Sequence, residues 1–269
     1  MNIKLVVTDM DDTLLSHDLQ VSRENKATVR ALEDRGIQVV LASGRSLYSM
    51  APYVRELELD RRPGFVISWN GAQVTDSFHG TLLFEYFLPV DLAHEIVDWA
   101  LSRSLVIQTH HGSEIRGIGQ NSYSILDSQL SGMSMLQVNK EDFFHYPHPK
   151  ILIPGDPVEL EEVEQEISRR WGKNIGLFRS KPYFLEIMPP EADKGLALAH
   201  LCREIGVSQS EVMAIGDGGN DVNMVRWAGL GVAMGNGTKE IQSVARWVTT
   251  RTNNEGGFAE AVNRFILTD

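Results

Sequence analysis

The sequence predicts an open, mostly parallel α/β sheet, interrupted by an inserted α+β domain. The first observation is a series of short, continuous apolar runs, and runs of this kind are typical of strands buried on both faces. The second is a helical pattern between several of the runs, which indicates the alternation of an open α/β sheet. The third is a middle segment, from about residue 81 to residue 188, in which short alternating segments replace the continuous apolar runs. The apolar runs lie at Leu5–Val7, Val39–Leu41, Phe65–Ile67, Val212–Ile215, Leu230–Met234 and Trp247–Val248.

Two helices of the core have clear ends in the sequence. One is expected from about Ser22, a favourable N-cap residue, to Gly36, a favourable stop. The other is expected from about Asp193 to Gly206. Its apolar face should contain Leu196, Leu198, Ala199, Leu201, Cys202 and Ile205.

The middle of the chain, from about residue 81 to residue 188, predicts a separate α+β domain. Short alternating segments there indicate half-buried antiparallel strands, and two longer segments have a helical pattern. The strands are expected at Leu82–Leu88 and Phe184–Met188, and the helices at Val90–Arg103 and Pro157–Trp171. We therefore expect residues 1–80 and 189–269 to form the α/β core and residues 81–188 to form an inserted α+β domain.

Composition and charge restrict the classes of partner. The chain has 269 residues and a net charge of -11, whereas binders of nucleic acids or anionic membranes need a basic surface. We therefore expect neither partner, although a local cation would still permit an anionic substrate. No apolar run reaches the roughly 18 residues of a membrane span, and the N-terminus has no signal-peptide pattern. The single cysteine, Cys202, fits core packing in a reducing compartment, so we expect a cytoplasmic protein of undetermined oligomeric state.

Polar residues follow five of the predicted strands. Ligands of open α/β sheets bind outside the carboxyl ends of the strands, so these residues indicate one shared site. They are Asp9, Ser43, Asn70, Asp217 and Asn236.

The first chemical motif is Asp9-Met10-Asp11-Asp12-Thr13, directly after the strand Ile3–Thr8. Residues two apart on an extended chain point the same way, so Asp9 and Asp11 can address one ligand. Two close carboxylates repel each other, and either one gains a proton or both need a cation. The motif can supply a nucleophile and an acid/base group. An acidic turn that caps a helix is an equally open interpretation of the motif alone.

The segment Gly216–Asp221, with the sequence Gly-Asp-Gly-Gly-Asn-Asp, is the most specific motif. Its glycines permit a tight loop and a close backbone approach. The oxygens of Asp217, Asn220 and Asp221 are hard ligands that suit Mg²⁺. The glycine spacing is not that of the dinucleotide fingerprint. We favour a metal or phosphate site over a purely structural loop.

Two further motifs could bind an anion. Ser43-Gly44-Arg45 ends a buried strand at an expected helix start, where free N–H groups bind anions. An ordinary N-cap serine is the competing interpretation. Lys194 opens a predicted helix, where the dipole disfavours a cation unless an anion is also present. A solvated surface lysine is the alternative.

Together these motifs resemble the haloacid dehalogenase superfamily of phosphatases, and more closely its Cof-type branch. The motifs Asp-x-Asp-x-Thr, Ser-Gly-Arg, Lys-Gly and Gly-Asp-x-x-Asn-Asp occur in the family's order. Further signatures are Asn70-Gly71-Ala72, Gly231–Asn236 and Asn254–Gly257. The resemblance implies a Rossmann-like core with a large inserted α+β cap. It covers both ends of the chain, whereas the inserted segment matches in placement and length alone.

The resemblance also implies roles for the site residues. Asp9 would attack phosphorus and form an aspartyl-phosphate, and Asp11 would protonate the leaving alkoxide and then activate water. Mg²⁺ would be held by the Asp9 carboxylate, the Asp11 backbone carbonyl and Asp217, with Asp221 completing the metal surroundings. The phosphate of a small phosphorylated metabolite would be bound by Ser43, Lys194 and Asn220, and by Gly44 and Arg45 of the Ser43 motif. For Arg45, Asn70 and Asn236, ligand contact and the tying together of loops are equally open.

One position departs from the family pattern. Asp12 stands where the family usually has glycine, and such a position tends to require an unusual backbone conformation. Aspartate tolerates that conformation better than most residues, so we expect the turn to be preserved.

Two other classes of function remain open. A phosphoryl-receiver domain also combines acidic residues, Ser/Thr and Lys, but it needs about half this length and has no counterpart of Gly216–Asp221. A phosphomutase or phosphotransferase would share every core residue. In the inserted segment, His110 and His111 follow a strand-like segment, Leu105–Thr109, and could contact a substrate. We favour solvated surface residues for both.

Overall fold

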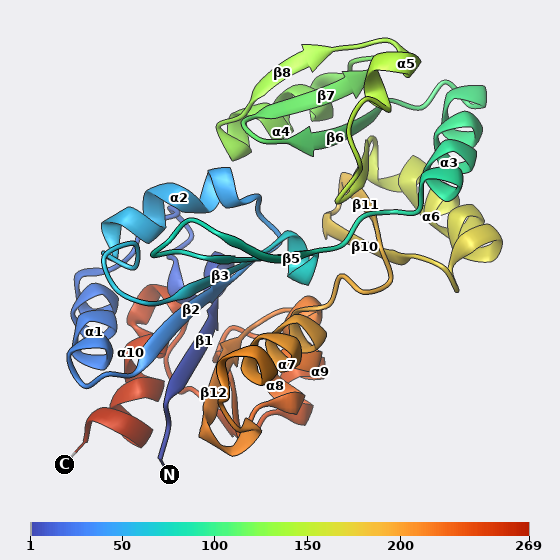
Figure 1. The fold of residues 1–269 in the computed structure, drawn as a ribbon. Helices are drawn as coiled ribbons and strands as arrows, with labels where there is room; N and C mark the ends of the chain where they lie inside the picture. The colour runs from blue at the N-terminus through green and yellow to red at the C-terminus, as the bar shows by residue number, and fades with distance from the viewer. Residues whose placement is uncertain (1, 269) are drawn as a thin grey trace. The chain divides into compact units, whose positions relative to one another are not determined.

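Residues 2–268 are described by a computed structural model, and they divide into two units, each with its own sheet (Figure 1). The first unit contains Met1–Ser43, Ala51–Phe84 and Asp193–Asp269. The second contains Gly44–Met50 and Glu85–Ala192. The division falls a few residues after each boundary expected from the sequence.

The first unit is built on an eight-stranded sheet. All of its pairs from β14 to β3 are parallel, whereas β4 is antiparallel to β3. The six strands predicted from apolar runs all lie in this sheet. Across the sheet the order is β14 (Trp247–Val248), β13 (Leu230–Ala233), β12 (Val212–Gly216), β1 (Leu5–Asp9), β2 (Gln38–Ala42), β3 (Phe65–Ser68), β4 (Gln73–Asp76) and β5 (Leu82–Glu85).

Strand β5 corrects one expectation. The segment Leu82–Leu88 had been assigned to the inserted domain, yet β5 is the last strand of the first sheet. A short turn causes this, because the N–H of Asp76 at the end of β4 donates to the carbonyl of Thr81 at 2.8 Å. The turn therefore returns the chain to the same sheet.

Helices cover both faces of the first sheet, with α1 and α10 on the opposite side from α7 and α8 (Figure 1). The predicted caps set two of the helix ends. Ser22 accepts from the N–H of Asn25 at the start of α1, and Asp193 accepts from the N–H of Leu196 at the start of α7. Gly36 and Gly206 follow these helices at positive φ. The helices are α1 (Arg23–Asp34), α2 (Leu47–Glu56), α7 (Lys194–Ile205), α8 (Val222–Trp227), α9 (Lys239–Val244) and α10 (Gly257–Val262).

Helix α7 packs its apolar face on the sheet, with one exception to the prediction. Leu198, Leu201 and Cys202 are buried with the side chains of β1 and β2. Burial raises the pKa of the Cys202 thiol to about 12, which confirms a packing role. Leu196, however, is 59% exposed, because it lies at the first turn and points away from the sheet-facing stripe.

The second unit contains a six-stranded sheet whose pairs are antiparallel except for the parallel pair of β7 and β8. The order is β10 (Gly176–Lys181), β11 (Phe184–Met188), β9 (Ile151–Pro154), β6 (Ile107–His111), β7 (Glu114–Ile118) and β8 (Ser134–Gln137). Strand β6 begins two residues later than expected. The helices are α3 (Val90–Ser102), α4 (Ser122–Ser131), α5 (Lys140–Phe143) and α6 (Pro157–Trp171).

A separate apolar core holds the second unit together. Ile107, Ile151 and Leu185 of the sheet pack with Ile96 of α3 and Ile167 of α6. This core shares no residue with the one beneath α7. The segment Gly44–Met50 joins this unit through a hydrogen bond of 2.8 Å from the Ser49 hydroxyl to the carbonyl of Ser131.

Candidate active site

The centre of the first sheet holds the chemically reactive side chains. Strand β1 lies between β12 and β2, so the chain turns to opposite sides of β1, and ligands bind at such a switch point. Asp9 is the last residue of β1, and Asp217 directly follows β12. Because β1 and β12 are parallel neighbours, both carboxylates reach the same edge of the sheet.

Lys194 lies between two carboxylates at the start of α7. Its Nζ is 2.5 Å from Asp9 Oδ1 and 2.6 Å from Asp221 Oδ1, and the lysine side chain is fully buried. Burial alone would lower the pKa of Lys194, but Asp221 and Asp9 raise it above its ordinary value. The interpretation as a solvated surface lysine is therefore wrong. The two aspartates supply the anions that a cation at a helix start requires.

Asp221 fixes the loop after β12. Its Oδ2 accepts hydrogen bonds of 3.1 Å from the N–H groups of both Asp217 and Gly218. A Cβ at Gly216 would lie 2.5 Å from the Cβ of Asp221, so only glycine leaves room for this carboxylate. The loop thus places Asp221 and Asp217 on opposite sides of one turn.

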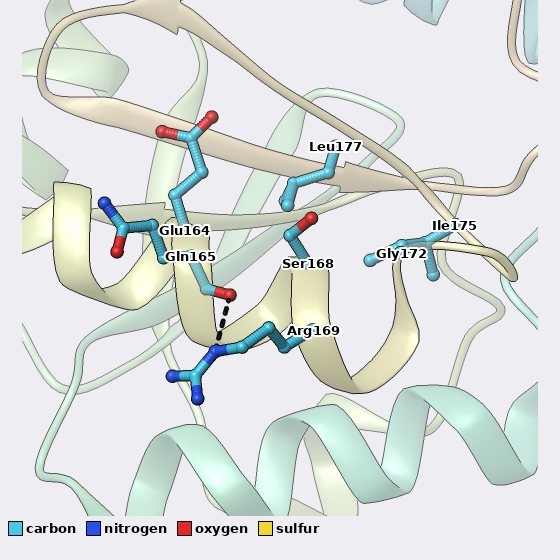
Figure 2. A pocket seen from close by; sticks show the side chains of 7 residues that line it. All are labelled: Glu164, Gln165, Ser168, Arg169, Gly172, Ile175 and Leu177. Carbon is cyan, nitrogen blue, oxygen red and sulfur yellow. Dashed lines mark hydrogen bonds between the residues drawn. The ribbon is translucent and has the colours of Figure 1, made fainter.

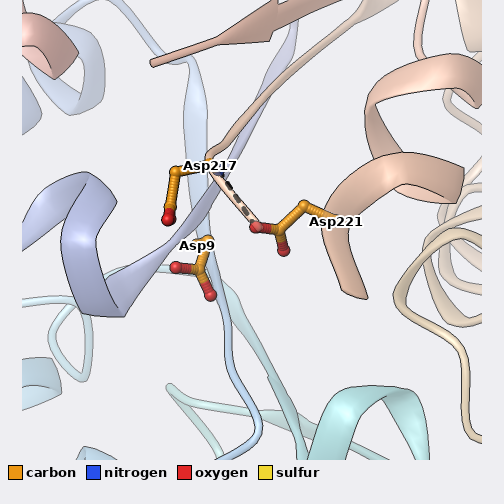
Figure 3. Close-up of side chains that lie close together, drawn as sticks. All are labelled: Asp9, Asp217 and Asp221. Carbon is orange, nitrogen blue, oxygen red and sulfur yellow. Dashed lines mark hydrogen bonds between the residues drawn. The ribbon is translucent and has the colours of Figure 1, made fainter. Parts of the chain in front are cut away.

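Three carboxylates come together at this edge. Ligand oxygens of Asp9, Asp217 and Asp221 all lie within 4.8 Å of one another (Figure 3). Burial and the neighbouring Asp221 raise the pKa of Asp9 well above its ordinary value. The same two causes raise the pKa of Asp217 to about 7. The cluster therefore stores electrostatic repulsion that a cation would relieve.

The donor set of this cluster fits Mg²⁺, which prefers hard carboxylate oxygens. Asp9 and Asp217 each keep one carboxylate oxygen outside the hydrogen bonds described for the chain. Both oxygens of Asp221 already have partners, in Lys194 and in the loop N–H groups. The side chain of Asp11 is not part of the cluster.

The turn after β1 has the conformation expected at Asp12. Asp12 has φ 59° and ψ 10°, and Asp11 before it is extended. The turn also brings Thr13 to the carboxylate cluster, where its hydroxyl donates to Asp217 Oδ1 at 2.7 Å. The sequence motif contains Thr13 but predicts no role for it, because its pairing with an aspartate 204 residues away has no local sequence signal.

The Ser43 motif differs from the expectation in its local structure. Ser43 is buried, and its N–H is not free for an anion, because it donates to the carbonyl of Ile67 at 2.9 Å. Ser43 does not start a helix either. Ser46 caps α2, with its hydroxyl accepting from the N–H of Ser49. Gly44 and Arg45 belong to the second unit, and their predicted contacts with phosphate remain predictions.

Asn220 and Asn236 make loop contacts. The amide of Asn220 donates to Asn70 Oδ1 at 2.9 Å, while the Asn220 residue remains exposed. Asn236 donates to the carbonyl of Asp12 at 2.8 Å and accepts from the N–H of Asn253. Ligand contact and the tying together of loops were both open for Asn236. These two hydrogen bonds show that it ties the loops of Asp12 and Asn253 together.

The histidines of the second unit lie in more enclosed places than expected. His110 is 4% exposed, and its Nε2 is 2.9 Å from Asp127 Oδ2. The surface interpretation is therefore wrong for His110. His111 is partly exposed and stacks on Tyr146, with ring centroids 3.7 Å apart.

A pocket of about 650 Å³ lies elsewhere, along α6 and β10 of the second unit (Figure 2). Its charged side chains already have partners. Arg169 donates to the carbonyl of Gln165, and Glu164 accepts from Arg179 Nε at 2.8 Å. Volume alone therefore does not identify the reactive site. In residues 2–268, no helix is both long and apolar enough to cross a membrane.

The fold and the carboxylate–lysine cluster define a phosphatase-type hydrolase with an α/β core, and comparisons with known proteins agree. Residues 6–262 match the family described as haloacid dehalogenase-like hydrolase. The chain belongs to this family, in its Cof-type branch, and is a phosphatase.

Individual relatives cover nearly the whole chain. A putative phosphatase of Bacillus subtilis is 32% identical, over 98% of this chain and 98% of its own. A 5-amino-6-(5-phospho-D-ribitylamino)uracil phosphatase of the same organism is 29% identical, over 99% and 97%. The crystal structure of a haloacid dehalogenase-like hydrolase from Bacteroides thetaiotaomicron superposes with a TM-score of 0.91 at 36% identity, over 98% and 100%.

Proposed function

We propose that this phosphatase hydrolyses a small phosphorylated metabolite with the help of Mg²⁺ and through an aspartyl-phosphate on Asp9. The observation that carries the proposal is the placement of Asp9 at the end of β1, between Lys194 and Asp217. Relatives that match 99% and 90% of the chain and are named as phosphatases of such compounds support the substrate class.

The nucleophile in this proposal is the free oxygen of Asp9. Its other oxygen is held by Lys194 at 2.5 Å, which orients the carboxylate and favours its ionised form against the opposing effects of burial and Asp221. Lys194 can then share its charge with the equatorial oxygens of the transferring phosphoryl group, and such neutralisation is the main source of catalysis in phosphoryl transfer. Ser43 and Asn220 are proposed to bind the remaining phosphate oxygens.

Asp11 is proposed as the general acid and then the general base. Protonated, it would give its proton to the oxygen of the leaving alcohol as the P–O bond breaks. Ionised, it would then take a proton from the water that attacks the aspartyl-phosphate. One residue serves both steps because the leaving group and the water occupy the same side of phosphorus in turn.

The proposed Mg²⁺ site uses the Asp9 oxygen that also contacts Lys194, the oxygen of Asp217 that Thr13 does not hold, and the backbone carbonyl of Asp11, so that the other oxygen of Asp9 stays available as the nucleophile. When bound, the ion supplies positive charge between the anionic nucleophile and the anionic phosphate. Thr13 holds the other oxygen of Asp217 and therefore sets its direction. For Asp221 to be a direct ligand, as the sequence suggested, it would have to exchange one of its present partners.

We also propose that the second unit, roughly the predicted insertion 81–188, selects the leaving group. Support comes from the location of the reactive side chains, which all belong to the first unit: Asp9, Lys194, Asp217 and Asp221. The second unit carries a polar group of buried side chains on its sheet: Gln108, His110, Lys150 and Glu186.

The test of the proposed function is a screen of phosphorylated metabolites in the presence and absence of Mg²⁺, measuring released phosphate. The expected result is Mg²⁺-dependent release from a subset of the compounds, and none by Asp9→Asn. Adding an excess of an acceptor alcohol and analysing the products separates hydrolysis from phosphoryl transfer. Phosphate found mainly on the acceptor would replace the hydrolase assignment with a transferase.

A further inference from the structure

The turn between β3 and β4 has a backbone that few side chains accept. Trp69 and Asn70 have φ values of 45° and 52°, and Gly71 follows at 99°. Non-glycine residues rarely occupy this left-handed region, and asparagine does so more readily than most. Consecutive residues of this kind persist where surrounding contacts fix them, and they gather at functional sites.

The contacts of this turn reach three elements of the active site. The N–H of Asn70 donates to the carbonyl of Ser43 at 2.9 Å. Its side-chain Oδ1 accepts from Asn220 Nδ2 at 2.9 Å. Asn70 is 3% exposed, whereas Asn220 is exposed, so Asn70 is the buried partner of a partly buried hydrogen bond.

Gly71 joins the turn to the third element, the start of α7. A Cβ at Gly71 would lie 2.4 Å from the carbonyl oxygen of Asp193, the residue that caps α7 and precedes Lys194. The helix start can approach the turn this closely because position 71 has no side chain. Asp193 is itself fixed by Asn223, whose Nδ2 donates to its Oδ2 at 2.6 Å.

We propose that Asn70 is a positioning residue that sets Asn220 relative to Ser43 and Lys194, so that the three meet one phosphate group. The inference rests on the proposed function, in which those three residues bind phosphate. They come from three separate stretches of chain, after β2, at α7 and after β12. The β3–β4 turn touches all three stretches, because Asn70 bonds to Ser43 and Asn220, and Gly71 lies close to the start of α7. Asn220 depends on it most, because that residue lies in an exposed part of its loop.

The test substitutes Asn70→Gly, which keeps the left-handed backbone and the N–H bond to Ser43 and removes only the amide that holds Asn220. The expected result on p-nitrophenyl phosphate is a roughly tenfold loss of kcat/KM, mostly through KM, with an unchanged unfolding midpoint. Ser104→Gly is the matched control. Ser104 also has positive φ, 57°, but lies in the second unit, and its variant should have wild-type kinetics.

A double-mutant cycle with Asn220→Ala separates positioning from direct binding. If Asn70 acts through Asn220, the double variant should be within about twofold of Asn220→Ala alone. Additive losses would overturn the inference, and so would wild-type kinetics for Asn70→Gly. A crystal structure of Asn70→Gly gives a second readout, in which the Asn220 amide should leave its wild-type position.

The two readouts separate this inference from the proposed function. If the wild-type protein releases no phosphate from any phosphomonoester, the proposed function fails. The crystal structure then still decides the inference, because an Asn220 amide that stays in place without Asn70 contradicts it.

Discussion

Asp9 and Lys194 are both ionisable, and both are almost completely buried. Such burial is costly unless each charge has a partner, and here one lysine serves two carboxylates. The arrangement leaves one negative charge in excess, before Asp217 is counted. Burial, together with the repulsion from Asp221, raises the pKa values of Asp9 and Asp217, while Asp221 and Asp9 raise the pKa of Lys194 against the effect of its own burial.

Asp9→Asn should abolish phosphate release and leave the protein folded. The amide is a poor nucleophile of nearly the same shape, and Lys194 keeps its bond to Asp221. Loss of a carboxylate whose pKa is raised also removes repulsion, so the unfolding midpoint should not fall. Steady-state phosphate release checks the first expectation and thermal unfolding the second. Residual turnover within about tenfold of wild type would contradict the nucleophile assignment.

His148 should make the second unit sensitive to acid. Burial, with a smaller contribution from His94, lowers the pKa of His148 from 6.5 to about 4. Because the folded pKa lies below the unfolded one, this contribution to stability is complete above pH 6.5 and is lost as the pH falls toward 4. Between pH 7.5 and pH 5 the loss should be about 2 kcal/mol, since one pKa unit corresponds to about 1.4 kcal/mol.

The measurement is denaturant unfolding of the full chain at both pH values. His148→Asn can still hydrogen-bond to the Thr109 hydroxyl, which lies 3.3 Å from His148 Nδ1, and it should remove most of the pH dependence. His145→Asn changes an exposed histidine of the same segment and should behave as wild type. Equal pH dependence in all three proteins would show that His148 is not the acid-sensitive group.

At the scale of elements, the active site is made by loops at strand ends, and each loop has its own physical reason. The loop Gly216–Asp221 turns tightly because Asp221 accepts two of its N–H groups, and Gly216 leaves room for that carboxylate. The turn after β1 uses the positive φ of Asp12 to bring Thr13 to Asp217. Both loops therefore fix carboxylates close together, at an electrostatic cost.

Asp217→Asn should separate metal binding from folding. The amide can keep the hydrogen bond from Thr13 but cannot carry the charge that Mg²⁺ binds. Because the pKa of Asp217 is raised to about 7 by burial and Asp221, removing the charge should raise the metal-free unfolding midpoint at pH 8 or leave it unchanged. Calorimetric titration should show Mg²⁺ affinity reduced by at least about tenfold, or roughly 1.4 kcal/mol.

The control for this experiment is Asp18→Asn, which changes an exposed carboxylate of the first unit and should leave both quantities unchanged. Unaltered Mg²⁺ affinity in Asp217→Asn would refute the proposed metal ligand. A fall in the metal-free midpoint would show instead that the Asp217 charge stabilises the fold.

At the scale of the whole molecule, two units with separate apolar cores divide the chain. In the second unit, His110 Nε2 lies 2.9 Å from Asp127 Oδ2, in a place where His110 is 4% exposed. Burial acts to raise the pKa of Asp127, but the interaction with His110 helps to hold it below its ordinary value. Removing His110 outright would take away one of the two side chains that bond to the buried Asp127 carboxylate, the other being Gln108, and such a loss is costly to folding.

His110→Gln is therefore a better probe of substrate choice than alanine, because glutamine can still donate to Asp127. If the second unit selects the leaving group, kcat/KM should change about tenfold for at least one metabolite and less than about twofold for p-nitrophenyl phosphate. His145→Gln should change neither. Steady-state kinetics on both kinds of substrate provide the measurement. An equal loss of kcat/KM on every substrate would show that His110 contributes to folding rather than to substrate specificity.

The sequence by itself determined the parallel core, the two capped helices, the family, and the aspartates and lysine of the site. These follow from short-range signals: continuous apolar runs, N-cap residues, and motifs whose residues are adjacent in the chain. The unusual backbone at Asp12 was predictable for the same reason, because the steric requirement of a positive φ acts on that single residue.

The tertiary structure alone decided which distant groups became partners. Thr13 with Asp217, Asn70 with Asn220 and His110 with Asp127 join residues far apart in the chain or on separate elements. It also decided that β5 extends the first sheet, that Ser46 rather than Ser43 caps α2, and that Leu196 is exposed. The physical reason is that burial, strand pairing and hydrogen-bond partners depend on which distant segments of the chain pack together. No local sequence pattern encodes that packing.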